Sequence, residues 1–118
     1  MDIDLFIEEA IAAGNRDGVE SLTPPQRLVF LISEAESDCD MNGIDSFLDR
    51  RAPLWLTATA EAFDAIGATE IGAEFRIAPI GAEVGDPRLD RLNELIVARS
   101  GYDYDAIARA VAKRLESK

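Results

Sequence analysis

Apolar residues at helical spacing are the feature that most constrains the fold of this chain. In segment after segment they recur at positions i, i+3, i+4 and i+7, so that each segment has one apolar face. Nothing alternates between apolar and polar residues over the length of a strand. The pattern predicts an all-α protein of six or seven short helices. Its 118 residues are enough for one compact domain, residues 1–118, with a core of its own.

Glycine marks the predicted end of the first helix. Residues 3–11 have one apolar face, and Gly14 follows as a residue that ends helices readily. Residues 15–22 show no clear period. We therefore expect the first helix to stop at Gly14 and a loop to follow.

Capping residues and prolines predict the other boundaries. Thr23, two prolines and then Gln26 form a capping box that begins a second helix, which should run to about Cys39. Asn42 and Gly43 are typical of a tight turn. Further helices are expected over about 45–50, 53–66, 69–78, 86–100 and from 103 or 105 onward. The expected N-caps are Asp45, Thr69 and either Asp103 or Asp105, and the other boundary residues are Pro53, Gly67, Pro79, Gly81, Asp86, Pro87, Ser100 and Gly101.

The net charge of −11 is concentrated in the first half of the chain. Residues 1–49 hold 12 acids against Arg16 and Arg27, whereas the remainder holds 11 acids against 10 bases. Such a field repels nucleic acid and anionic lipid and attracts basic proteins or cations. We therefore expect no direct binding to nucleic acid or membrane. The acidic start of the sequence and the lack of a long apolar run favour a cytoplasmic protein.

One stretch of this acidic half contains no basic residue between Leu28 and Asp49. Its carboxylates predict a negative strip that binds a groove on a basic protein. The alternative is a solvated face that keeps the protein soluble. The sequence leaves homo-oligomerisation open. The candidate partner-binding residues are Glu34, Glu36, Asp38, Asp40, Asp45 and Asp49.

The segment from Asp38 to Asp49 also fits the ligand spacing of a calcium-binding EF-hand loop, with Gly43 at the sharp turn. Three features disagree with that assignment. The last ligand is Asp49 and not a glutamate, Asp45 replaces an inward apolar residue, and no second loop is present. Calcium binding therefore remains the alternative function. Its ligands would be Asp38, Asp40, Asn42, Ile44, Ser46 and Asp49.

An enzyme is not expected. The chain has no histidine, which removes the commonest general base, and it has no glycine-rich phosphate loop. Cys39 lies among carboxylates, which should raise the pKa of its thiol and weaken it as a nucleophile. We expect Cys39 to be a small packed side chain. No cofactor is predicted.

Taken together, the helix QRLVFLISEAESD, the turn NGIDSFL and the helix ending AFDAIGATEIGAEF resemble a known family. It is a large bacterial family of small acidic helical proteins, mostly of unknown function, which includes the DNA-mimic protein of nineteen kilodaltons. Its hallmark is Asn-Gly-Gly-Phe after an acidic helix end. Gly43 matches the second glycine, Ile44 the phenylalanine and Phe47 a later aromatic, while Asn42 replaces the first glycine and tolerates left-handed backbone.

The resemblance covers roughly residues 20–115. It implies a helical fold in which Asn42, Gly43 and Phe47 form a structural turn with an inward aromatic. For the DNA-mimic member it implies carboxylates that imitate duplex phosphates and occupy the DNA-binding face of a basic regulator. We therefore expect a non-enzymatic interaction module whose partner is a basic protein, in the most specific form a DNA-binding regulator.

Overall fold

The computed structural model describes residues 2–51, 55–78 and 86–116, and these residues form seven α-helices and no strand. The all-α fold predicted from the sequence is confirmed. None of the described helices is both long enough and apolar enough to cross a membrane. The helices are α1 (Ile3–Asp17), α2 (Pro24–Met41), α3 (Ile44–Arg51), α4 (Leu56–Ala65), α5 (Thr69–Arg76), α6 (Pro87–Val97) and α7 (Tyr104–Glu116), with a short 3-10 turn, η1 (Val19–Ser21), between α1 and α2.

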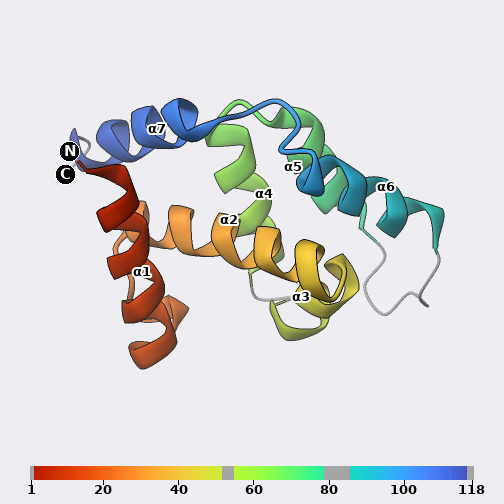
Figure 1. Ribbon diagram of the computed structural model, residues 1–118, viewed down its shortest axis with the longest axis horizontal. Coiled ribbons are helices and arrows are strands. Elements are labelled where there is room, and N and C mark those ends of the chain that lie inside the picture. Colours follow the sequence, from red (N-terminus) through yellow and green to blue (C-terminus); the bar gives the residue numbers. More distant parts are fainter. Residues whose placement is uncertain (1, 52–54, 79–85, 117–118) are drawn as a thin grey trace.

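Helix α2 is the centre of the arrangement, and α1, α3, α4, α6 and α7 all pack against it (Figure 1). Helix α1 lies at one end of α2, whereas α3 and α6 lie at the other. Helices α4 and α5 form the most extensive helix pair. Because α2 is in contact with so many elements, its buried side includes Leu28, Phe30, Leu31 and Ile32. Its acidic C-terminal half is thereby brought beside α3 and α6.

The core is built around a chain of aromatic contacts. Phe47 of α3 meets Phe75 of α5 edge to face at 6.0 Å between ring centroids. Phe75 stacks on Phe63 of α4 at 5.5 Å, and Phe63 meets Tyr102 at 5.8 Å. Such pairs add to the free energy gained from burial alone. They fix α3 and the segment before α7 relative to the α4–α5 pair.

The first helix is longer than the sequence predicts. It does not stop at Gly14 but continues to Asp17 and ends at Gly18, so residues 15–22 are a last helical turn followed by η1. Gly14 serves a different purpose, because a Cβ there would lie 2.3 Å from Cε1 of Phe30. The missing side chain lets α1 pack directly on the Phe30 ring of α2.

Two predicted caps are confirmed and two are wrong. Thr23 forms the expected capping box with Gln26, and the Asp103 carboxylate accepts a hydrogen bond from the Ala106 backbone N–H at 2.8 Å. Thr69 is not a cap, because Ala68 holds that position and α5 begins at Thr69. Asp45 is not a cap either, because α3 already begins at Ile44.

Three predicted helix ends also shift. Helix α2 reaches Met41, two residues beyond Cys39. Helix α5 ends at Arg76, and α6 ends at Val97 and not near Ser100. The expected boundaries at Pro53, Pro79 and Gly81 lie outside the described residues.

Candidate interaction surface

A two-residue turn joins the acidic end of α2 to α3. The backbone N–H groups of Asn42 and Gly43 both donate to the Asp38 carbonyl, at 2.7 and 2.6 Å. Gly43 has a φ of +94°, which a residue with a side chain rarely adopts, whereas Asn42 has a φ of −126°. Asn42 therefore does not adopt the left-handed backbone that asparagine tolerates. The turn needs glycine only at position 43, so asparagine fits at position 42 without strain.

Helix α3 is held at its start by a contact with α6 and on one face by burial in the core. The Asn93 side chain of α6 accepts a hydrogen bond from the Ile44 backbone N–H at 3.0 Å, which satisfies one of the free donors at the start of α3. Phe47 is 1% exposed and Leu48 is 3% exposed, so the opposite side of α3 faces the core. Asp45 and Asp49 are one helical turn apart on the remaining surface.

Arg50 binds two of the acids in the strip. Its guanidinium pairs with the carboxylate of Asp38 and lies 3.5 Å from that of Glu34. Asp38 is only 7% exposed, so a charge there requires a partner inside the protein. The hydrogen bond to Asp38 and the neighbouring negative charges raise the pKa of Arg50 above its ordinary value. Asp38 thus holds α3 against α2 and faces away from solvent.

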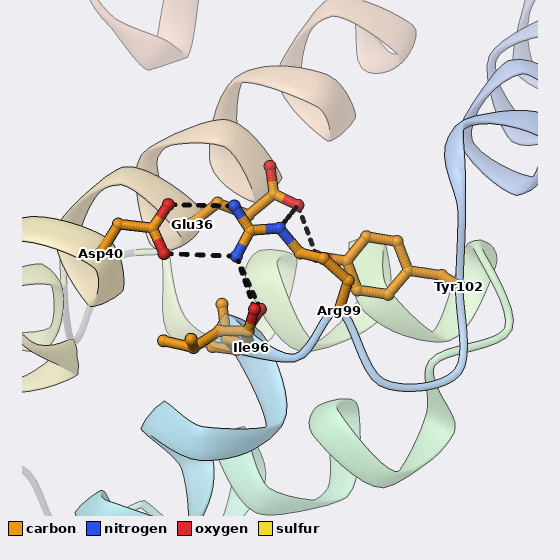
Figure 2. Close-up of polar contacts among 6 residues, drawn as sticks. Glu36, Asp40, Ile96, Arg99 and Tyr102 are labelled. Carbon is orange, nitrogen blue, oxygen red and sulfur yellow. Dashed lines mark hydrogen bonds and ion pairs between the residues drawn. The ribbon is translucent and has the colours of Figure 1, made fainter.

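Arg99 binds the other two acids of the strip in α2, Glu36 and Asp40 (Figure 2). Its Nε lies 3.0 Å from Oε2 of Glu36, while Nη2 and Nη1 lie 3.0 and 3.4 Å from the two oxygens of Asp40. The hydroxyl of Tyr102 donates to the same Oε2 of Glu36 at 2.5 Å. The hydrogen bond from Arg99 holds the pKa of Asp40 below its usual range. Burial, followed by the bond to Glu36, raises the pKa of Tyr102.

The backbone of Arg99 is also unusual. It has a φ of +52° and is the only described residue other than glycine with a positive φ. The Ser100 N–H donates to the Leu95 carbonyl and the Arg99 N–H to the Ile96 carbonyl, which is the Schellman pattern that ends a helix and usually places glycine at this position. The side chain turns back to donate to the Ile96 and Val97 carbonyls. Arg99 therefore ends α6 and reaches α2 at the same time.

The six predicted partner-binding residues fall into two groups. The first comprises Glu34, Glu36, Asp38 and Asp40 of α2, which the structure ties to Arg50 or Arg99. Neither arginine is evident from the sequence as a partner of the strip, because Arg50 follows its last residue and no spacing rule connects Asp40 to a residue 59 positions later. The second group, Asp45 and Asp49 of α3, forms no ion pair with another described residue.

The same segment does not have the geometry of an EF-hand loop. Asp38 and Asp40 lie within α2, and Ser46 and Asp49 lie within α3, so only two residues are outside helices. In a calcium loop the ligands at positions 1, 3, 5, 7, 9 and 12 instead surround one ion. Within the ranges that the structure describes, no group of three or more acidic or cysteine side chains is placed to hold a metal.

A family model described as DMP19-like protein matches residues 20–113. The chain belongs to the DMP19-like family. The resemblance stated from the sequence is thereby confirmed over nearly the expected range. In this DMP19-like chain the match includes the whole acidic strip, both arginines and the turn at Gly43, whereas α1 precedes it. No curated protein and no solved structure matches the chain.

The single cysteine of this DMP19-like protein is buried beneath the acidic surface. Cys39 is 7% exposed, and burial, followed by the charges of Asp40 and Asp38, raises the pKa of its thiol to about 12. At neutral pH the thiolate that nucleophilic chemistry requires is therefore scarce. Cys39 packs as part of the core.

Proposed function

We propose that this DMP19-like chain is a non-enzymatic, cytoplasmic interaction module that occupies the basic DNA-binding surface of a regulator by imitating DNA. The observation that carries the proposal is the family match over residues 20–113. A net charge of −11 supports it, because a protein that replaces DNA must present an excess of negative charge to a cationic groove. Neither nucleic acid nor a membrane is bound directly in this scheme.

The proposed binding surface is the acidic end of α2 together with α3. Asp40 and Asp49 are exposed and Asp45 is half-buried, so these three carboxylates contact the partner directly. Glu34 and Glu36 lie deeper, and Asp38 acts through Arg50, which it holds in place. The six carboxylates outnumber the two arginines, which bind only four of them, so the surface remains negative.

Rigid helices suit this role. The carboxylates of a mimic must stay at fixed positions to match side chains that normally meet phosphates, and ordering flexible side chains on binding costs free energy. Here the arginine contacts hold Glu36 and Asp40 in place before a partner arrives. Binding should therefore be fast, favoured by low salt and selective for strongly basic surfaces.

The test is capture of basic proteins from a host lysate, followed by competition with DNA. The immobilised chain should retain a DNA-binding protein, and excess duplex DNA should release it, because both ligands use the same groove. The variant D40N/D45N/D49N should weaken capture strongly at moderate salt. The triple variant D4N/E8Q/E9Q removes the same charge from exposed positions of α1 and should have little effect.

Two outcomes would contradict the proposal. One is that the retained proteins are not basic, or that duplex DNA does not release them. The other is that D4N/E8Q/E9Q weakens capture as much as D40N/D45N/D49N does, which would mean that total charge and not this surface governs binding. Circular dichroism of both variants would verify that each keeps its helices.

A further inference from the structure

The contacts among Arg99, Glu36, Asp40 and Tyr102 form a cluster, here called the Arg99 cluster. A small cavity opens beside it, between the end of α2 and the start of α7. Its volume is 280 Å³, just below the range of about 300–1,000 Å³ typical of pockets for drug-sized molecules. A cavity of this size is better suited to one long side chain. Its lining combines acids, an arginine and tyrosines with one apolar residue at the base. The lining residues are Glu36, Arg99, Tyr102, Asp103, Tyr104 and Ile107.

The carboxylate of Glu36 has one oxygen left for a ligand. Its Oε2 already accepts from the Tyr102 hydroxyl and faces Nε of Arg99. Its Oε1 has no hydrogen bond or ion pair with another described residue, and Figure 2 shows it pointing away from the Arg99 cluster. The side chain is only 22% exposed, which limits the water that can reach it. Because Glu36 lines the cavity, we expect a hydrogen-bond donor that enters it to bond to this oxygen.

The charges around the cavity select a cation. The Arg99 guanidinium is neutralised within the protein, because its donors face Glu36, Asp40 and two backbone carbonyls of α6. Asp103 adds a second lining carboxylate, one oxygen of which accepts from the Ala106 N–H. The local balance is therefore negative despite the arginine. An anionic ligand would be repelled.

Tyr104 provides an aromatic surface at the mouth of the cavity. It is the first residue of α7 and is 64% exposed, whereas Ile107, one turn later, is 5% exposed and closes the base. An exposed aromatic ring beside carboxylates is a common arrangement for receiving a guanidinium, which can stack on the ring while donating to oxygen.

We infer that this cavity receives an arginine side chain of the basic partner, which stacks on Tyr104 and donates to Oε1 of Glu36. The inference rests on the proposed function, since it assigns one anchoring contact in the complex with the basic protein. It adds α7 to the interface already formed by α2 and α3. It also gives the partner a feature beyond positive charge, namely an arginine that projects far enough to enter a pocket.

The experiment uses N-acetyl-arginine amide as the probe and follows the amide NMR spectrum of the intact chain. Saturable shifts at Glu36, Tyr102, Tyr104 and Ile107 are expected. The corresponding citrulline amide has nearly the same shape without the charge and should give none. Because no partner protein is involved, this result is independent of whether a regulator is ever captured.

Two variants locate the contact. Y104A should weaken binding of the arginine amide about two- to five-fold, the loss expected for an exposed cation–π contact. E36Q should weaken it about tenfold, as for a hydrogen bond that loses its charge. E9Q, an exposed position on α1, should bind like the parent chain. Shifts spread over all acidic residues, equal binding of citrulline amide or no saturation would each overturn the inference.

Discussion

Arg99 shows how one residue can hold two distant helices together. A left-handed backbone costs a residue with a side chain of order 1–3 kcal/mol, and glycine would avoid that cost. Arginine is nevertheless present, and its guanidinium meets Glu36, Asp40 and the last carbonyls of α6. These contacts offset the strain of the backbone. The sequence offers no sign of this, because an arginine before Ser-Gly resembles any other helix end.

Replacing Arg99 should separate its two contributions. R99A loses the ion pairs and keeps the strained backbone, whereas R99G loses the ion pairs and relieves the strain. We therefore expect both variants to be less stable than the parent, with R99G more stable than R99A by about 1 kcal/mol. Urea unfolding would measure the difference. Equal stabilities, or a more stable R99A, would mean that the backbone at this position is not strained.

The contact between Arg99 and Asp40 should also appear in the acid sensitivity of the protein. The folded-state pKa of Asp40 lies below its usual value of 3.8, so the contribution of its carboxylate to stability is complete above about pH 4. It is lost as the pH falls through the folded-state pKa. Urea unfolding at a series of pH values should show stability falling below about pH 4. D40N should make that fall shallower, and an unchanged slope would contradict the assignment.

At the level of elements, the sequence predicted the interiors of the helices better than their ends. The apolar stripes are correct because burial on one helical face is a strong and repeated signal, and Thr23 was found because its cap is local. The predicted helix end at Gly14 was wrong because glycine both ends helices and allows two helices to pack closely. Glycine is needed at position 14 because the ring of Phe30, on another helix, lies against it, and no local sequence pattern reveals that contact.

Substituting Gly14 tests that explanation. Alanine is a better helix former by about 1 kcal/mol, yet its Cβ would overlap the Phe30 ring, and overpacking costs about 1–3 kcal/mol. We expect G14A to lower the free energy of unfolding. The loss should be smaller in an F30L background, where the ring is absent, and a double-mutant cycle by urea unfolding would show this coupling. A stabilising G14A would indicate that α1 does not lie this close to α2.

The junction of α2 and α3 leads to a prediction about calcium. Asp38 and Asp40 are bound by different arginines, and the segment lacks a loop that encloses an ion. We therefore expect millimolar calcium to leave the melting temperature unchanged relative to a chelator, since a ligand that binds only the folded state must stabilise it. A rise that disappears in D49N would restore the EF-hand alternative.

For the molecule as a whole, the sequence predicted the fold class, the family and the excess of negative charge. It did not predict how that charge is distributed. The strip lacks bases along the chain, but folding brings Arg50 and Arg99 onto it from α3 and from the end of α6. Local composition describes neighbours in sequence, whereas ion pairs form between neighbours in space. The cavity at Tyr104 could not be predicted from the sequence for the same reason, because its lining residues come from helix α2 and from residues 99–107, which are far apart in the chain.

The Arg99 cluster also bears on how fast the protein unfolds. Its contacts join Arg99 to Asp40 across 59 residues and Tyr102 to Glu36 across 66. Closing such long loops costs conformational entropy before the contacts contribute any favourable free energy. We therefore expect these bonds to form after the folding transition state. Y102F removes the bond from Tyr102 to Glu36, so it should accelerate unfolding and leave the folding rate nearly unchanged, which stopped-flow kinetics in urea would show. The cluster would thus govern the lifetime of the native state.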